Sequence, residues 1–426
     1  MTTAPEAGAP PRTALLDPAP TSVPAPRPEA LPPVRRLPPA VAGVIGSALT
    51  GYVFAAHGAK PGVLLLLGIG LGVALFHSRF GFTSAWRQLV AVGNGTGLRA
   101  HTLLLGSTAT LFALIIGTGS GLFGSVPTPS AGPIGVALLI GAFLFAVGMQ
   151  LGGACASGTL FAVGSGQGTI VLTLLGFITG STLAAWQFGL WNDLPALAPY
   201  VMSDHVGLFG SWAVTIAVLA AVWFAARAIQ ARRTPPPIGT PPSARGALRR
   251  TVRGSWPLAA GALVLAVLGA GVLLVSGGAW GVTSAFALWG TKVVDALGGS
   301  PETWAYWQQP GSAAQLSQPV LADKTSLTDI GIMVGAAVAA AAGGVWKLHG
   351  GIPARTALAA VVGGVLMGVG ARLAGGCNIG AYLAGIASGS LHGWVWAAVA
   401  LLGTWAGLRL RPLFGLGNPK PTDSVC

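Results

Sequence analysis

Long apolar runs, separated by short polar or glycine-rich segments, follow one another along most of the chain. Each run approaches the length of about 17–25 residues that an α-helix needs to cross the hydrocarbon core of a bilayer. Ten runs meet this criterion, which predicts ten membrane-spanning helices. They lie at 40–57, 61–77, 101–118, 133–152, 168–189, 206–227, 256–276, 328–346, 355–374 and 393–410. The stretches 78–100, 153–167 and 278–297 are interrupted by Gly, Ser and Thr, which favours re-entrant or broken helices there.

The composition agrees with this pattern. Only 8% of the residues are charged, 53% are hydrophobic and the mean hydropathy is +0.71, and a soluble chain of this size could not cover its surface with so few charges. The 66 glycines would be costly in soluble helices, but small residues let the helices of a membrane bundle pack closely. The sequence therefore predicts an all-α polytopic membrane protein.

The formal net charge of +13 could indicate a nucleic-acid-binding protein. However, most Arg and Lys residues lie in the tails and in the loops after the second, sixth and eighth apolar runs, whereas the loops 190–205 and 298–327 hold several of the few acidic residues. This asymmetry is the positive-inside pattern of membrane topology. It predicts a multi-pass inner-membrane protein with both termini in the cytoplasm. The basic residues therefore reflect insertion in a lipid bilayer and not binding of nucleic acid.

Five segments follow from these patterns. They are a disordered cytoplasmic tail at 1–37, a first membrane half at 38–227, a basic Pro- and Arg-rich cytoplasmic linker at 228–255, a second membrane half at 256–411 and a cytoplasmic tail at 412–426. The first segment is rich in Pro and Ala and lacks the continuous apolar core of a signal peptide. Prolines in the linker prevent a continuous helix there.

Two blocks of the sequence occur twice. Phe-Gly-Phe-Thr-Ser-Ala-Trp at 80–86 matches Trp-Gly-Val-Thr-Ser-Ala-Phe at 280–286, and the segment 147–158 around Cys155 matches the segment 369–380 around Cys377. The charge pattern places the first Thr-Ser-Ala block after a span that ends inside and the second after one that ends outside. We therefore expect two halves with inverted topology, whose broken helices form an hourglass around a central constriction, as in many transporters and channels.

The two internal cysteines are the strongest candidates for a functional role. A lone cysteine in an apolar segment is usually an inert small hydrophobe, but Cys155 and Cys377 occupy matching positions in glycine-rich loops, which favours a substrate pathway. Cys426 lies in the polar C-terminal tail and is interpreted as incidental, and the absence of any Cys-x-x-Cys pair argues against a disulfide framework or a zinc site. The predicted pathway residues are Cys155, Cys377, Gly153, Gly376, Ser157, Asn378, Thr83, Ser84, Thr283, Ser284 and Arg372.

Two alternatives stay open for these residues. Arg372, which corresponds to Gln150 of the first half, is an ionisable group within an apolar run, so it either serves the pathway or extends its charge to the outer surface. The hydroxyls of the two Thr-Ser-Ala blocks either donate hydrogen bonds to an anion or bond back to their own helices.

Acidic residues are expected outside the secure spans, with Asp329 at a span edge and Asp295 in an interrupted segment. A carboxylate that could couple transport to protons or sodium is therefore not predicted, and no Walker A motif for ATP is present. These observations favour a channel or a facilitator without cofactor, metal or catalytic residues, not an enzyme.

Together, the cysteine loops of the form Gly-x-x-Leu-x-Gly-(Gly/Ala)-Cys and the Trp-Gly-Val-Thr-Ser-Ala block resemble the YeeE/YedE family of sulfur-compound transporters. The resemblance covers roughly residues 60–190 and 256–410. It implies an hourglass-shaped protein in which the thiols of Cys155 and Cys377 meet a small sulfur anion, with thiosulfate the first candidate. Family members often carry Arg-Phe-Cys at the first turn, where this chain has Gly81, so a third thiol contact is absent and another sulfur or selenium oxyanion is the alternative.

Two other functions are compatible with the same residues. The cysteines could form a membrane-embedded thiol or persulfide sulfur relay, or the chain could be a structural subunit that binds a larger complex through the loop 298–327. A cytosolic sulfur-carrier protein that docks on the basic linker is a further predicted partner.

Overall fold

The computed structural model describes residues 33–235 and 251–420. Most of the tail predicted at 1–37, the middle of the predicted linker at 228–255 and the last residues of the tail predicted at 412–426 lie outside these ranges, as does Cys426.

Helices make up most of the described chain. In the first half they are α1 (Leu37–His57), α2 (Ala59–Ser78), α3 (Phe82–Val92), α4 (Thr96–Thr118), α5 (Val136–Gly152), α6 (Ala156–Gly164), α7 (Gly168–Trp186), α8 (Gly189–Asn192) and α9 (Ser203–Arg233). Two short strands, β1 (Ile134–Gly135) and β2 (Ala196–Leu197), form an antiparallel pair that aligns Ile134 with Leu197.

The second half is also helical. It contains α11 (Leu258–Ser276), α12 (Thr283–Ala296), η1 (Pro301–Thr303), α13 (Pro310–Ser317), α14 (Lys324–Ala342), α15 (Ala354–Leu373), η2 (Asn378–Leu383), α16 (Ala384–Ala387), α17 (Leu391–Leu410) and η3 (Arg411–Phe414). Within the described ranges, ten helical segments are long and apolar enough to cross a membrane. This finding confirms the predicted all-α polytopic membrane protein.

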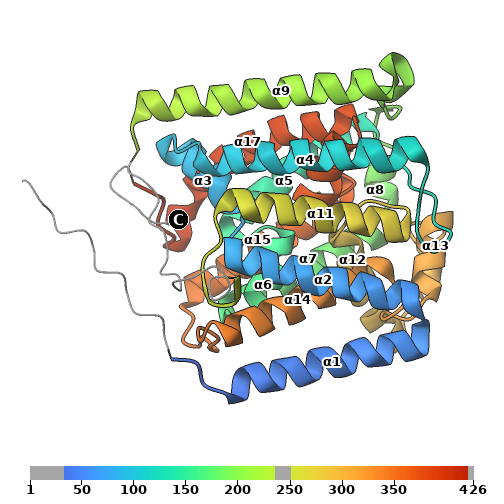
Figure 1. The fold of residues 1–426 in the computed structure, drawn as a ribbon, viewed down its shortest axis with the longest axis vertical. Helices are drawn as coiled ribbons and strands as arrows, with labels where there is room; N and C mark the ends of the chain where they lie inside the picture. Colours follow the sequence, from blue (N-terminus) through green and yellow to red (C-terminus); the bar gives the residue numbers. More distant parts are fainter. Residues whose placement is uncertain (1–32, 236–250, 421–426) are drawn as a thin grey trace, which may run out of the picture.

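The long helices lie side by side in a bundle with α1 and α9 at its two edges (Figure 1). In the most apolar stretches of α1 and α9, only 11% and 17% of the residues are buried, compared with 67% in α14. Helix α15 packs against α5 and α7, and α14 packs against α2. The edge helices therefore present their apolar side chains to lipid, whereas α14 and α15 belong to the core.

Close packing of α5 on α15 depends on glycine. A Cβ atom on Gly148 would lie 2.5 Å from the carbonyl oxygen of Gly363, so the two backbones touch at a point where no side chain fits.

The two ends of the bundle differ in charge. At one end lie the start of α1, the end of α9 and the C-terminal η3 (Figure 1). Basic residues gather in the segments at this end, which we call the basic end, and they include Arg36, Arg79, Arg99, Arg233, Arg253, Lys347, Arg355 and Arg409. The loops with Asp193 and Glu302 lie at the other end, beside α8 and α13 (Figure 1). The predicted cytoplasmic location of the basic end stays a prediction.

The interrupted stretches of the sequence form short helices. Helices α3, α6 and α12 contain 11, 9 and 14 residues, which is too short to cross a bilayer. Helix α5 ends at Gly152, the next residue Gly153 has a φ of 85°, and α6 begins only after Cys155. The break between α15 and η2 lies in the same way before Cys377.

Candidate functional site

Cys155 begins the short helix α6. Its backbone is extended, and its sulfur accepts a hydrogen bond of 3.4 Å from the N–H of Gly158. The sulfur also lies 3.7 Å from the hydroxyl of Ser157, and only 2% of the cysteine is exposed. Cys155 is thus the N-cap of α6, a position in which a side chain satisfies an N–H group that the helix itself leaves unpaired.

Cys377 has the same role in the second half. It is the N-cap of the π-helix η2, its sulfur accepts a hydrogen bond of 3.4 Å from the N–H of Ile379, and the side chain is fully buried. Helix η2 continues directly into α16. Both cysteines are free thiols, so the match found in the sequence extends to their local geometry.

The two cysteine loops meet inside the bundle. Helix α6 contacts both η2 and α14. Cys155 caps α6 and Cys377 caps η2, so the contact between these two helices brings both cysteine loops to the same region, next to α14 with Asp329. The structure therefore brings together the two predicted cysteines and adds a carboxyl group that the sequence analysis did not place there.

In each cysteine loop, an exposed glycine lies two residues before the buried cysteine. Gly153 and Gly375 are exposed, whereas Cys155 and Cys377 are buried. Gly153 and Gly375 have φ angles of 85° and 68°, which favour glycine, and Gly376 at φ 154° leaves no room for a side chain because its Cβ would lie 2.8 Å from the backbone nitrogen of Ala381.

Several polar atoms beside the cysteines are buried without a hydrogen-bond partner. Both oxygens of Asp329, both amide atoms of Asn378 and the hydroxyl of Thr83 are in this state. Buried polar groups without partners are costly and uncommon. Other buried polar atoms of the bundle are also unpaired, but Asn378 directly follows Cys377 and Asp329 lies on α14, which contacts α6, so the cysteine loops have polar side chains available to bind something other than protein.

The expected position of Asp329 at a span edge was wrong. The carboxylate of Asp323 accepts a hydrogen bond of 2.7 Å from the N–H of Ser326 and starts α14 at Lys324, earlier than the apolar run indicated. Asp329 consequently lies in the second turn of a membrane-spanning segment and is fully buried. The eighth membrane-spanning segment therefore contains a buried carboxyl group, which the sequence analysis had placed only at its edge.

The hydroxyls of the Thr-Ser-Ala blocks have different partners. Ser84 donates a hydrogen bond of 3.2 Å to the carbonyl of Gly81, just before its own helix, whereas Ser284 donates one of 3.0 Å to Thr325 of α14. Thr283 accepts a hydrogen bond of 3.0 Å from Arg372. These contacts position α12 against α14 and α15, and Thr83 alone of the four keeps a buried, unpaired hydroxyl.

Arg372 is half-buried and held by two side chains. It donates hydrogen bonds to the Tyr306 hydroxyl at 2.6 Å and to Thr283, and its guanidinium lies 5.8 Å from the centre of the Tyr306 ring. The corresponding Gln150 accepts a hydrogen bond of 3.0 Å from Arg87 of α3. In each half, the residue five positions before the cysteine therefore ties its helix to the Thr-Ser-Ala helix.

A chain of aromatic rings, which sequence reasoning missed, connects the two halves beside the cysteine loops. Successive ring centres are 4.8–6.0 Å apart. The rings run from α12 to α3 in the order Phe286, Phe177, Phe145, Trp396, Tyr382 and Phe82. Tyr382, five residues after Cys377, could have indicated this chain in the sequence. An aromatic residue in an apolar segment, however, usually only packs in the hydrophobic core.

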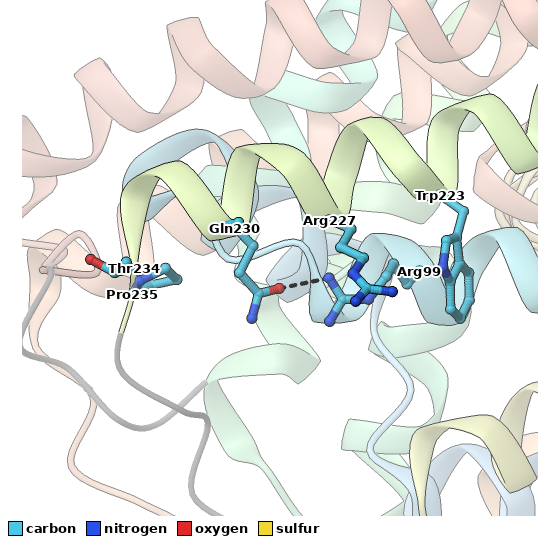
Figure 2. Close-up of a pocket in the computed structure, with 7 residues that line it drawn as sticks. Arg99, Trp223, Arg227, Gln230, Thr234 and Pro235 are labelled. Carbon is cyan, nitrogen blue, oxygen red and sulfur yellow. Dashed lines mark hydrogen bonds between the residues drawn. The ribbon is translucent and has the colours of Figure 1, made fainter.

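A separate cavity of about 460 Å³ opens at the basic end, between α4 and α9. Its described lining residues are Arg99, Trp223, Arg227, Gln230, Ala231, Thr234 and Pro235. Figure 2 shows the guanidinium groups of Arg99 and Arg227 next to each other, with Arg99 hydrogen-bonded to Gln230 at 2.7 Å. None of the predicted pathway residues lines this cavity.

Comparison with known proteins decides the family. The profile of the Sulphur transport family matches residues 77–406, a range that contains both cysteine loops and both Thr-Ser-Ala blocks. The chain belongs to the Sulphur transport family. This membership confirms the resemblance to sulfur-compound transporters and places the chain with transporters, not enzymes.

Individual members of the Sulphur transport family agree. The thiosulfate transporter TsuA of Spirochaeta thermophila is 29% identical over 362 residues, which cover 80% of this chain and 96% of that protein. The thiosulfate transporter TsuA of Escherichia coli is 24% identical over 354 residues, or 80% of this chain and 92% of its own. The probable transporter YedE of E. coli is 32% identical over a shorter stretch of 167 residues, 38% of this chain and 41% of that protein.

Proposed function

We propose that this protein carries a small sulfur-containing anion, in the first place thiosulfate, across the inner membrane through a pathway that closes at Cys155 and Cys377. The observation that carries the proposal is that the two buried cysteines cap two short helices, one from each half, and that these two helices contact each other inside the bundle. The similarity to two thiosulfate transporters over four fifths of the chain supports the choice of anion.

The hydrogen bonds of the two cysteines suit weak binding of an anion. Each sulfur accepts a hydrogen bond from a backbone N–H, and each S–H proton can be donated to a ligand, in Cys155 in place of the contact with Ser157. A thiol is a weak donor, so several weak contacts hold the anion without slowing its release. The positive ends of α6 and η2 add a favourable potential for negative charge.

The loops fit a mechanism of alternating access. The helix before Cys155 ends next to Arg411, whose guanidinium donates a hydrogen bond of 2.6 Å to the carbonyl of Gln150, whereas Arg372 ahead of Cys377 is bonded to Tyr306 of the loop after α12. We infer that the two halves are inverted and that each loop guards the pathway from its own end of the bundle. The burial of both cysteines supports a pathway that is closed between transport steps.

Orientation follows from the charge asymmetry. Under the positive-inside rule the basic end faces the cytoplasm, so the anion enters past Arg372 and leaves past Gln150. Docking of a cytosolic sulfur-carrier protein at the basic end stays a prediction.

Uptake by purified protein in liposomes tests the proposal. Radiolabelled thiosulfate, sulfite and sulfate, and labelled selenite, are offered separately, and protein-free liposomes give the background. We expect saturable uptake of thiosulfate above that of sulfate, because only thiosulfate offers a soft terminal sulfur to the thiols. Uptake no faster than in protein-free liposomes for all four anions would refute transport, and equal rates for all four would refute recognition of sulfur.

A further inference from the structure

The buried carboxyl group of Asp329 has no described partner that could neutralise its charge. Asp329 is fully buried and neither of its oxygens has a hydrogen-bond partner. An ionisable group in a membrane-spanning segment is expensive and is usually functional. The nearest cation in the sequence, Lys324, turns away and donates a hydrogen bond of 3.5 Å to the carbonyl of Ala279.

The elements packed around Asp329 offer its carboxyl oxygens no hydrogen-bond partner. Helix α14 packs against α1, α2, α6 and α12. The titratable and charged side chains on these elements, on α14 itself and at their caps are Arg36, Tyr52, His57, Lys60, His77, Arg79, Cys155, Lys292, Asp295, Asp323 and Lys324. None of these side chains forms a hydrogen bond with the carboxyl group of Asp329. The carboxylate of Asp323 is already engaged by Ser326 and by Gln315 at 3.0 Å.

An anion at the cysteine loops would meet Asp329 directly. A carboxylate there would repel the anion, whereas a protonated carboxyl group could donate a hydrogen bond to it, as the thiols do. The pathway can therefore hold the anion only while Asp329 carries a proton.

We propose that Asp329 is the proton carrier of the transporter, so that one proton enters and leaves with each anion. The carboxyl group takes a proton from the side on which the anion binds, keeps it while the loops are closed, and gives it to water on the other side after the anion leaves. No covalent bond to the anion forms or breaks. This inference rests on the proposed function, since it concerns the same site.

A pH gradient across liposomes tests this coupling. Purified protein is reconstituted, the membrane potential is held at zero with potassium and valinomycin, and thiosulfate accumulation is measured with the outside one pH unit more acidic. One proton per anion predicts about tenfold accumulation inside at steady state. Asp329→Asn, which mimics the protonated form, should let thiosulfate equilibrate without accumulating, whereas the exposed Asp295→Asn should accumulate it like the unaltered protein.

The outcomes separate this inference from the proposed function. If the unaltered protein equilibrates thiosulfate but does not accumulate it, or if a sodium gradient drives accumulation instead, proton coupling through Asp329 is wrong while transport stands. Accumulation by Asp329→Asn at the normal level also overturns it. Should this variant not fold, a pH-sensitive dye inside liposomes of the unaltered protein must report acidification during thiosulfate influx, and no acidification rejects the proposal.

A second inference comes from the groove between α4 and α9. At the basic end, the guanidinium groups of Arg99 and Arg227 repel each other and no acidic side chain is among the described residues that line their cavity (Figure 2). Two adjacent positive charges without an acidic partner form a binding site for an anion.

An apolar cavity of about 560 Å³ continues along the same two helices. It shares Trp223 with the basic cavity, and it is lined mainly by apolar residues such as Ile216, Leu219 and Phe224. A charged pocket at the membrane surface that continues into an apolar groove matches the shape of a phospholipid. We infer that an anionic phospholipid binds here, with its phosphate between Arg99 and Arg227 and an acyl chain along α4 and α9.

Lipid binding can be measured by native mass spectrometry of the purified, delipidated protein after addition of phosphatidylglycerol or phosphatidylcholine, and by thermal stability in detergent. We expect phosphatidylglycerol to bind and stabilise the unaltered protein and the control Arg355→Gln, and to lose most of both effects in Arg99→Gln/Arg227→Gln. The inference would be overturned if the double variant bound phosphatidylglycerol as well as the unaltered protein does, or if the unaltered protein bound phosphatidylcholine equally well. Stabilisation by inorganic phosphate as strong as by the lipid would show a free-anion site instead and overturn the inference.

Discussion

Arg372 of α15 donates a hydrogen bond of 3.0 Å to the hydroxyl of Thr283, the first residue of α12. The bond ties a side chain five residues before Cys377 to the second Thr-Ser-Ala block, and Tyr306 holds the same guanidinium at 2.6 Å. Arg372 is thus fixed by protein groups at the end of the bundle opposite the basic end, which makes it part of the frame around the second cysteine loop.

A double-mutant cycle tests this frame. Arg372→Gln and Thr283→Val should each lower the thermal stability of the purified protein, and the two effects should be coupled by roughly 1.5–3 kcal/mol, the range for a hydrogen bond to a charged group. Strictly additive losses would show that the bond contributes nothing to the fold.

Gly376 should not tolerate a side chain. Its φ of 154° and the 2.8 Å separation between an added Cβ and the nitrogen of Ala381 predict that Gly376→Ala costs about 1–3 kcal/mol of stability and slows thiosulfate uptake. The matched control is Gly417→Ala, since a Cβ there meets no atom within 4 Å. The two variants behaving alike in melting and uptake would contradict the prediction.

Substitution of Asn378 should affect stability and transport in different ways. Because both atoms of its buried amide lack partners, Asn378→Leu should leave folding unchanged or strengthen it by roughly 1–3 kcal/mol, yet uptake should fall because a ligand-binding group is lost. The exposed Asn192→Leu serves as control. A variant at 378 that is less stable but transports normally would show that the amide serves only the fold.

Thiol labelling tests the inverted arrangement. During transport, a membrane-impermeant thiol reagent should reach Cys377 from the end of the bundle that holds Tyr306 and Cys155 from the basic end, and excess thiosulfate should slow both reactions. Single-cysteine variants in liposomes of known orientation distinguish the two. Labelling of both thiols from the same side would rule out that each cysteine loop guards the pathway from its own end of the bundle.

Much of this arrangement could be predicted from the sequence. Apolar length alone gives the ten spanning segments, and the repeated blocks identify Cys155 and Cys377 as equivalent residues. Asp329 was misplaced because a hydrogen bond at Asp323, and not hydrophobicity, sets the start of α14. The role of Arg372 stayed open because its partner Tyr306 comes from a distant loop whose position no local pattern reveals.

The central claim is that the anion passes the two cysteine loops, and thiosulfate uptake by Cys155→Ala and Cys377→Ala in liposomes tests it most directly. Removing a methyl-sized thiol from a cap position is expected to keep the protein folded, and Cys426→Ala in the C-terminal tail is the matched control. The account predicts that each internal variant loses most of the uptake and that the control transports like the unaltered protein. Uptake at the unaltered rate in both internal variants would contradict it.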